Sequence, residues 1–491
     1  MKLPWMGIGR VALVGALGAG LVAAAQADPR TVQVRAGAQG AQAAPAGATT
    51  VPLSSRLVTC AGQELTGTEG VPDVELTGTV NAVSLPAELR PADVVGDGAM
   101  AIAYGPVDAS ASATQAGAVL SAPLAAGSAA LTVRVTGSLA PGVVAGQEWS
   151  SDTATLRGLA GTSCPTAAAD QWLIAGGGAP GRQERLVLTN PGANEVSATI
   201  EVLGAQGAVS GAADRGVVVP AGGRAVVLVD ALAAAEPAPV VHVTVRGGTV
   251  SATLTDTWLD GSVADGADTT GAVAAPALTQ VIPVVWLRQA GALRIAVPGP
   301  DQAVVSARLL TPQGPVPVST DDGGVARIQG GTVLELPLQA GTEGVVGVEV
   351  TSDVPVVAAA VSVARAEGGV GDFAWSASAT PITGIAGAAL VADGPARQIN
   401  LVATGGDVQA RIATLEAGAV TTRELSLAAD STVTTDLGSP SAVWVVRIGG
   451  AGELRAGVAS QVGADTTAFL SALTLADLPL TTAATSAVPL P

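Results

Sequence analysis

The stretch Val240-Val241-His242-Val243-Thr244-Val245 decides the fold class, because an apolar residue recurs at positions 241, 243 and 245. Successive side chains of a β-strand point to opposite faces, so this alternation predicts a strand with one buried and one exposed face. The pattern returns about every 100 residues, which is too long a period for a solenoid. Its copies are Ala130-Leu131-Thr132-Val133-Arg134-Val135, Val240 to Val245, Val345-Val346-Gly347-Val348-Glu349-Val350 and Val443-Trp444-Val445-Val446-Arg447-Ile448.

Two further sets of strands repeat in the same phase. The first set comprises 185–188, 293–296 and 398–401, and the second comprises 198–203, 305–310 and 408–415. In addition, the pentapeptide Gly266-Ala267-Asp268-Thr269-Thr270 recurs unchanged at 463–467. Because independent registers agree, we predict an internal repeat.

A repeat of about 100 residues with short alternating strands is typical of a β-sandwich domain. We therefore predict an all-β protein made of tandem immunoglobulin-like β-sandwich domains. The predicted parts are a signal peptide or N-terminal membrane anchor (1–27), a flexible linker (28–50), four β-sandwiches (51–168, 169–279, 280–383 and 384–482) and a tail (483–491).

The composition supports large buried cores and excludes one class of partner. Hydrophobic residues make up 48% of the chain and aromatic residues only 2%, so Val, Leu, Ile and Ala must fill the cores. The net charge is −17 and no basic stripe is visible. An acidic chain repels phosphate backbones, so nucleic acid is not an expected partner.

The first residues have the pattern of an export signal. Lys2 and Arg10 precede an apolar run from Val11 to Ala25, and Ala25-Gln26-Ala27 offers a small-x-small cleavage site. The run is shorter than the ~20 residues of a membrane-spanning helix. We predict a secreted or envelope-associated protein, with an uncleaved N-terminal anchor as the alternative, and membrane contact only through this segment.

Cys60 and Cys164 are the chain's two cysteines, and they bracket the first predicted domain. Cysteines of exported proteins most often pair, so we predict a disulfide between them. A reactive thiol is the alternative.

One part of the chain resembles a known family. The residues that carry the resemblance are Cys164-Pro165, Trp172, Gly176-Gly177-Gly178 and Arg185-Leu186-Val187-Leu188-Thr189-Asn190-Pro191-Gly192. They resemble a family of large secreted actinobacterial proteins of unknown function. The resemblance implies an envelope location and a gene neighbourhood with glycosyltransferases, and it implies no activity. From the residues themselves, the glycines predict a turn in preference to a phosphate-binding loop, since neither a helix nor a lysine follows.

The sequence lacks the residues that most kinds of catalysis require. His242 is the chain's one histidine and lies in a strand, facing away from its apolar side, so we interpret it as a surface residue. Lys2 is the sole lysine, which excludes Walker A loops and Schiff bases. No catalytic residue, cofactor site or metal site is predicted; a calcium loop with Asp260, Asp265 and Asp268 is a weaker alternative.

Tryptophans are the candidates for contacts. Trp172, Trp258 and Trp375 are possible partner or junction contacts, Trp258 and Trp375 because each lies near the end of a predicted unit. They serve core packing, the junctions between domains, or a sugar or protein partner. No single unit is enriched in acidic and aromatic residues.

These observations lead to a functional hypothesis. We expect an exported, non-catalytic cell-envelope protein that acts as a structural, scaffold or binding module, with an envelope glycan or envelope protein as its partner. The alternative is a carbohydrate-active enzyme or sugar-binding adhesin that works on envelope polysaccharide.

Overall fold

A computed structural model describes residues 32–35, 49–105, 110–124, 130–209, 216–288, 290–320, 324–339, 344–365, 369–392, 394–463 and 468–487. Within these ranges the chain is all-β, as predicted, with two short 3₁₀ helices, η1 (Ala87–Leu89) and η2 (Val229–Ala231), and no α-helix. The described residues contain no helix that could span a membrane. The predicted signal peptide or anchor at 1–27 lies outside them.

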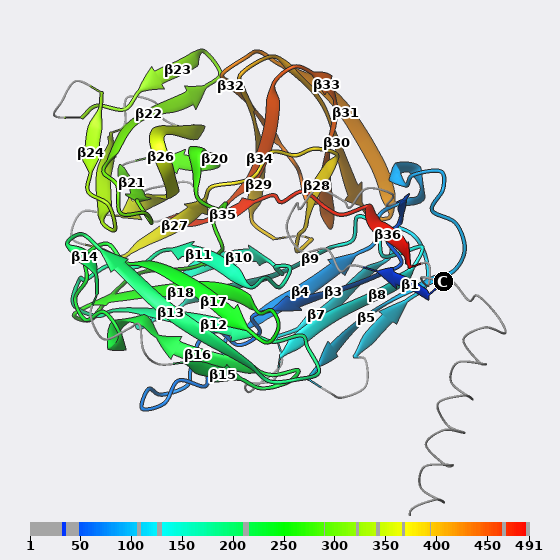
Figure 1. The fold of residues 1–491 in the computed structure, drawn as a ribbon, viewed down its shortest axis with the longest axis horizontal. Helices are drawn as coiled ribbons and strands as arrows, with labels where there is room; N and C mark the ends of the chain where they lie inside the picture. Colours follow the sequence, from blue (N-terminus) through cyan, green and yellow to red (C-terminus); the bar gives the residue numbers. More distant parts are fainter. Residues whose placement is uncertain are drawn as a thin grey trace, which may run out of the picture. The chain divides into compact units, whose positions relative to one another are not determined.

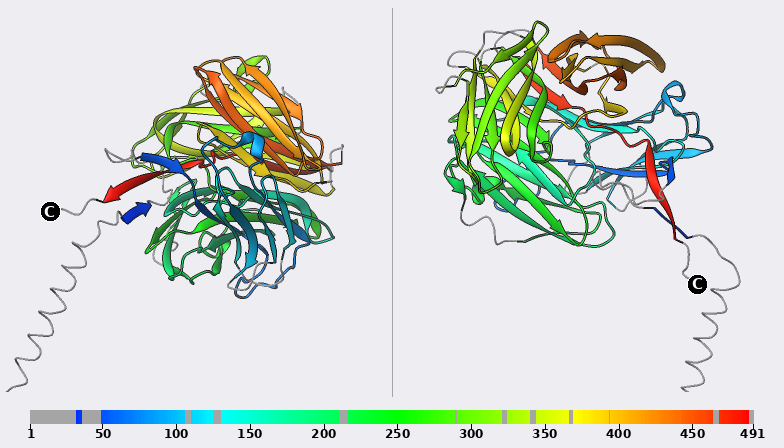
Figure 2. Two further views of the ribbon diagram at one scale, coloured as in Figure 1. Left: turned by 90° about the vertical axis from the view of Figure 1, so that its right-hand side faces the viewer. Right: turned by 45° about the horizontal axis from the view of Figure 1, so that its top comes forward.

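Residue contacts divide the chain into two compact units, 53–480 and a smaller unit of 1–52 with 481–491. The described part of the smaller unit is an antiparallel sheet in the order β1-β36-β2, visible in Figure 2 as a red strand beside blue ones. Its strands are β1 (Val32–Arg35), β2 (Thr49–Pro52) and β36 (Thr481–Ala487). Within the segment 28–50, for which the sequence predicts a linker, β1 and the first residues of β2 are strands, and β1 pairs with β36 from the distant C-terminal segment. The linker itself stays a prediction.

The larger unit begins with sheet pair 1, in which the sheets β3-β8-β5-β6 and β10-β9-β4-β7 share one core. Buried Val80, Ile102, Val133 and Trp149 belong to that core. The strands are β3 (Ser55–Cys60), β4 (Gly78–Val83), β5 (Gly98–Tyr104), β6 (Ala111–Ala113), β7 (Val119–Pro123), β8 (Leu131–Gly137), β9 (Val144–Asp152) and β10 (Arg157–Ser163).

Sheet pair 2 consists of β11-β17-β13-β14, with β15 beside β13, and β16-β12-β18-β19. Its core contains Leu186 and Leu254 from one sheet and Ile200 and Val243 from the other. The strands are β11 (Asp170–Ile174), β12 (Arg182–Thr189), β13 (Val196–Gly204), β14 (Gly207–Ala208), β15 (Val217–Val219), β16 (Arg224–Leu228), β17 (Val240–Arg246), β18 (Ser251–Asp260) and β19 (Val263–Gly271).

Sheet pair 3 contains one long strand, β26, that runs through both of its sheets. The first part of β26 pairs with β20 and β22, and the second part with β21 and β27. The strands are β20 (Ala277–Leu287), β21 (Ala290–Ala296), β22 (Ala303–Thr311), β23 (Gly314–Pro317), β24 (Ala326–Ile328), β25 (Val333–Gln339), β26 (Gly344–Arg365) and β27 (Gly371–Ala377).

Sheet pair 4 consists of β28-β33-β30-β31 and β32-β29-β34-β35. Leu401 and Val458 from one sheet and Ile412 and Val443 from the other meet in its core. The strands are β28 (Ile385–Ala389), β29 (Ala396–Thr404), β30 (Val408–Glu416), β31 (Ala419–Leu427), β32 (Ser431–Asp436), β33 (Ala442–Gly450), β34 (Glu453–Val462) and β35 (Phe469–Thr474).

All four sheet pairs have the same strand order. The strands of each pair can be numbered 1 to 8 in chain order, with β14 and β15 counted as one strand, β23 and β24 as one strand, and the two parts of β26 as two strands. Strands 1, 6, 3 and 4 then form one sheet of each pair, and strands 5, 2, 7 and 8 form the other. The repeats read from the sequence fall on equivalent strands. The copies of the Val240 to Val245 pattern are always strand 6, the set at 185–188, 293–296 and 398–401 is always strand 2, and the set at 198–203, 305–310 and 408–415 is always strand 3. The pentapeptide does not behave in this way, because its first copy lies in β19 and residues 464–467 of its second copy lie outside the described residues.

Each sheet pair takes its strands from one predicted domain, apart from the first residues of β20. Contacts nevertheless join 53–480 into a single compact unit. The division into four domains therefore stays a prediction.

The last strands of the four sheet pairs, β10, β19, β27 and β35, are here called the terminal strands. β10 contacts β19 and β35, and β27 contacts the same two strands; three of them carry labels near the middle of Figure 1. Each terminal strand is an edge of its own sheet, so one side of its backbone lacks a neighbouring strand. An unpaired strand edge invites aggregation, and these four edges cover one another. The backbones of β10 and β19 approach each other closely, since a Cβ on Gly158 would lie 2.3 Å from the Ala267 carbonyl oxygen.

Candidate functional site

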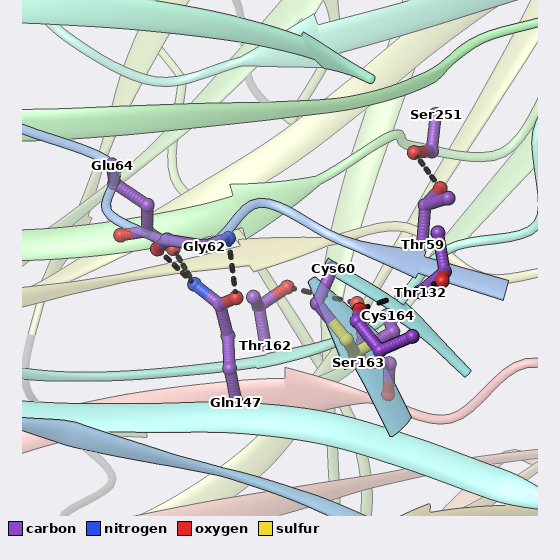
Figure 3. Close-up of a disulfide and its surroundings, with 11 residues drawn as sticks. Thr59, Cys60, Gly62, Glu64, Thr132, Gln147, Thr162, Ser163, Cys164 and Ser251 are labelled. Carbon is purple, nitrogen blue, oxygen red and sulfur yellow. Dashed lines mark hydrogen bonds between the residues drawn. A yellow bond between two sulfur atoms is a disulfide. The ribbon is translucent and has the colours of Figure 1, made fainter. Parts of the chain in front are cut away.

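The predicted disulfide is present. Cys60, the last residue of β3, is bonded to Cys164, which follows β10, across a Cα–Cα distance of 4.4 Å (Figure 3). The bond closes sheet pair 1 by linking its first strand to the segment after its last. Beside it, the Thr59 and Ser251 hydroxyls form a hydrogen bond between sheet pairs 1 and 2.

Glu64 makes a second buried connection between these two sheet pairs. Its Oε2 accepts from the indole nitrogen of Trp149 at 2.8 Å and from the hydroxyls of Thr255 and Thr269, while Gln147 donates to Oε1 (Figure 3). Burial raises the pKa of Glu64, and the four hydrogen bonds lower it in part. The carboxyl group acts as a structural acceptor.

A single carboxyl group joins all four terminal strands. Asp372 on β27 is fully buried and accepts the backbone N–H groups of Ala267 on β19 and Leu470 on β35. The backbone N–H groups of Leu159 on β10 and of the neighbouring Phe373 also lower the pKa of Asp372. The Ala267 bond to Oδ1 is 3.2 Å long and the Leu470 bond to Oδ2 is 2.8 Å. Because a buried N–H group without an acceptor is costly, Asp372 satisfies strand edges that no ladder reaches.

The stability of the protein should decrease with rising pH. Burial raises the pKa of Asp372 to about 8, and burial together with Asp230 raises the pKa of Glu184 to about 9. Unfolded carboxyl groups have pKa values of about 4, so the native state binds more protons between about pH 4 and pH 9. We expect the thermal unfolding midpoint to be highest near the acidic end of this range and to fall as these groups ionise. Differential scanning calorimetry across the range tests this, and a midpoint that rises towards pH 9 would contradict it.

Two more buried carboxylates connect sheet pairs 2 and 3 through Trp375. Asp268 accepts the Trp375 backbone N–H at 2.6 Å, and Asp256 accepts its indole N–H at 2.8 Å. Burial raises the pKa of Asp268 well above its usual range. Arg182 donates to both oxygens of Asp256, at 2.9 and 2.5 Å.

The glycine-rich turn at 176–178 is occupied by the chain's own groups. The N–H of Gly176 donates to Asp256 and that of Gly177 to Glu184, at 3.1 and 2.7 Å. Arg294 of sheet pair 3 donates to the Gly176 carbonyl at 3.0 Å. These contacts agree with a structural turn, because carboxylates take the N–H groups that a phosphate would need.

A pocket of about 240 Å³ lies between sheet pairs 2 and 3, and we call it the arginine–tryptophan pocket. Its polar and aromatic lining residues are Arg182, Arg294, Arg365, Asp265, Glu335, Trp258, Trp375 and Phe373. Arg365 lies 4.6 Å from the centre of the Trp258 ring system, and Arg294 lies 4.8 Å from that of Trp375. Acidic and aromatic groups therefore converge here.

Ion pairs hold both acids of this pocket. Glu335 accepts from Arg294 at 2.8 Å, and Asp265 Oδ2 pairs with Arg365. Asp265 is buried, and its other oxygen, Oδ1, has no hydrogen-bond partner among the described residues. A buried carboxylate oxygen without a donor is unusual in a folded protein.

The three predicted tryptophans have different surroundings. Trp375 is buried at the contact of sheet pairs 2 and 3, and Trp258, partly buried, donates to the Pro180 carbonyl beside the same pocket. Trp172 stacks on His242 with ring centres 4.0 Å apart. The structure thus brings Trp258 and Trp375 together and places Trp172 apart from them.

Among the described residues, His242 and two aspartates of the alternative calcium loop are engaged by other groups of the protein. His242 is partly buried between Asp170 and Glu201, each 3.2 Å away. Asp265 and Asp268 are bound to Arg365 and Trp375 instead of to a common centre. In the described ranges no three His, Cys, Asp or Glu side chains are arranged to hold a metal ion.

Sequence reasoning missed Asp372, Asp256 and the three pocket arginines. One signal was available, since Asp372 stands between apolar residues of a short strand where a charged side chain is unfavourable. The pocket itself left no such signal, because its acids and aromatic residues come from two sheet pairs.

A family of unknown function, DUF5719, matches residues 119–438. The chain belongs to this family. The DUF5719 region contains every residue of the arginine–tryptophan pocket, from Arg182 to Trp375. It also contains the residues on which the resemblance to secreted proteins of unknown function rests; the actinobacterial origin and the glycosyltransferase neighbourhood stay predictions.

Solved structures give no further guidance. Thermotoga maritima 1070 is 20% identical over 17% of this chain and 78% of that chain, with a TM-score of 0.15. A tetra-tandem repeat in the extending region of a large adhesion protein is 13% identical over 83% and 93%, with a TM-score of 0.10. Escherichia coli alpha-2-macroglobulin activated by porcine elastase is 10% identical over 87% and 44%, with a TM-score of 0.12. Such low scores carry no argument, and no curated protein matches the chain in sequence.

Proposed function

We propose that the protein is an exported, non-catalytic component of the cell envelope whose arginine–tryptophan pocket binds an envelope glycan. In this proposal the four sheet pairs are immunoglobulin-like sandwiches that form a scaffold, and the DUF5719 region supplies the binding site. The N-terminal segment directs export and is either cleaved or kept as an anchor.

The disulfide supports the extracytoplasmic part of the proposal. Cys60 and Cys164 are bonded, and stable disulfides are rare in reducing compartments. The apolar run at 11–25, followed by a small-x-small site, is the sequence feature that would deliver the chain there.

The observation that carries the binding function is that carboxylate, arginine and tryptophan side chains line one pocket, among them Asp265, whose buried Oδ1 has no hydrogen-bond partner among the described residues. Sugars offer hydroxyl donors for such an oxygen and C–H faces for aromatic rings. Arginine donors and the Glu335 carboxylate provide further hydrogen-bonding groups around the same space. Ligand sites commonly combine apolar walls with a few convergent polar groups.

A carbohydrate-active enzyme is the second candidate, because Asp265 and Glu335 line the same pocket and glycosidases use two carboxyl groups. Each acid, however, is already engaged by an arginine. If the protein is an enzyme, it should release reducing ends from envelope polysaccharide, and Asp265→Asn or Glu335→Gln should abolish that release.

Replacing Trp258 by alanine should weaken glycan binding about 10-fold or more, which is the effect of a central aromatic contact. The measurement is isothermal titration of the purified protein with polysaccharide fragments prepared from the envelope of the source cells. Asp265→Asn should also weaken binding, because the amide replaces an acceptor oxygen.

Trp286→Ala provides the matched control. Trp286 is also partly buried and also lies near an arginine, Arg288, at 5.7 Å, but it does not line the pocket. Equal losses in Trp258→Ala and Trp286→Ala would show that the pocket is not the binding site. Turnover of the polysaccharide would favour the enzyme.

A further inference from the structure

A second, larger cavity of about 460 Å³ lies where the terminal strands end, and we call it the strand-end pocket. It is lined by the last residues of β10, β19, β27 and β35, by the segments that follow them, and by residues of β3, β9 and β28, among them Arg56 on β3. No residue of the arginine–tryptophan pocket lines it. The two cavities are therefore separate sites.

Arg56, which is partly buried, is the one cationic side chain among the residues that line this cavity. Its guanidinium donates to the Val143 carbonyl at 3.1 Å and to the Thr166 hydroxyl at 3.4 Å. Within the described part of the chain, its buried Nε has no hydrogen-bond partner and no carboxylate forms an ion pair with the guanidinium. Burial lowers the pKa of Arg56 to about 10.

A desolvated cation without a counter-ion is costly, and buried charges in proteins are normally paired. Three buried arginines of this chain follow that rule: Arg182 is paired with Asp256, Arg294 with Glu335 and Arg397 with Glu148. Buried Arg185 and Arg224 form no ion pair among the described residues either, but neither of them lines the strand-end pocket. The departure at Arg56, on the wall of a cavity, points to an anionic group supplied from outside the chain.

The remaining polar lining is rich in hydroxyl groups. Thr162 and Thr270 at the ends of two terminal strands bond to the carbonyls of their own neighbours at long distances, 3.3 and 3.4 Å. A hydroxyl group both donates and accepts, so these side chains suit a ligand that carries several hydroxyls. Asp170 and Asp477 also line the cavity. Their carboxylates accept hydrogen bonds from hydroxyl groups of a ligand, and their negative charges repel a ligand that carries several negative charges.

We propose that the strand-end pocket binds a sugar acid, a polyhydroxylated molecule with one carboxylate, and that Arg56 binds the carboxylate. A single negative charge matches one guanidinium, and the hydroxyl groups of the ligand face the threonines and the two aspartates. Arginine forms strong, directional hydrogen bonds with carboxylates. The strand-end pocket is independent of the proposed glycan pocket and differs from it by selecting a negatively charged ligand.

Titration calorimetry of the full chain with D-glucuronate, D-glucose and inorganic phosphate tests the proposal. We expect saturable binding of glucuronate, at least about 10-fold weaker binding of glucose, and no binding of phosphate in competition with glucuronate. Arg56→Gln should weaken glucuronate binding at least about 10-fold, because it removes the charge. Arg134→Gln is the matched control, since Arg134 is exposed on the neighbouring strand β8 and should leave binding unchanged.

If Arg56→Gln unfolds the protein, Thr270→Val provides a second variant. Valine keeps the shape of the threonine side chain and removes one hydroxyl group from the wall of the cavity, so Thr270→Val should also weaken glucuronate binding. Equal affinity for glucose and glucuronate, or unchanged glucuronate affinity in Arg56→Gln, would overturn the proposal. Trp258→Ala should leave glucuronate affinity unchanged. Loss of glucuronate binding in that variant would place the sugar acid in the arginine–tryptophan pocket and overturn the proposal, whereas loss of polysaccharide binding alone concerns only the first site.

Discussion

Asp372→Ala is expected to lower the free energy of unfolding by at least about 3 kcal/mol, because several buried N–H groups lose their acceptor at once and each costs about 1–3 kcal/mol. Those groups belong to all four terminal strands, so the loss acts on the place where these strands meet. Urea unfolding followed by tryptophan fluorescence measures the change.

Asp372→Asn should have a smaller but clear effect. The amide keeps one acceptor oxygen and turns an NH₂ group towards N–H donors, which leaves at least one strand unsatisfied. It should also flatten the pH dependence of stability, since the substituted side chain does not titrate. Asp301→Asn is the control, because Asp301 is exposed. A stable Asp372→Ala protein that unfolds at the wild-type urea concentration would show that the carboxyl group does not hold the four strands together.

Removal of the disulfide is expected to have an effect of similar size. Cys60 and Cys164 are 104 residues apart, and the loop-entropy model assigns such a cross-link about 4.7 kcal/mol. Other contacts at the same place reduce the loss, among them the hydrogen bonds of Arg224 to the carbonyls of Ala61 and Gln63, each 2.7 Å long. We therefore expect the Cys60→Ala/Cys164→Ala protein to lose between about 2 and 4 kcal/mol.

Chemical reduction gives an independent measurement of the same quantity. The wild-type protein in excess dithiothreitol should unfold at the midpoint of the double variant, and the reductant should leave the double variant unchanged. If wild type and double variant unfold together under oxidising conditions, the bond does not stabilise the native state.

The strands could be predicted from the sequence because their signal is local. Alternation at positions 241, 243 and 245 reports which side of a strand is buried, and the same local pattern identified equivalent strands in all four sheet pairs. The strand at Val32–Arg35 could not be predicted in this way, because its partner β36 lies at the other end of the chain.

The pairing of the cysteines could also be predicted, since an exported chain with two cysteines offers one intramolecular disulfide. The neighbourhood of that bond was beyond prediction. Glu64, for example, lies in a loop after β3, and its partners Trp149, Thr255 and Thr269 come from two sheet pairs.

By itself, the sequence determined the all-β class, the repeating strands and the cysteine pair, because periodicity and composition act within a strand or a single repeat. The tertiary structure alone decided which edges meet, and with them the place of Asp372, the arginine–tryptophan pocket and the strand-end pocket with Arg56. Each of these depends on side chains from different sheet pairs, and no spacing along the chain encodes the distance between two separately folded sheets.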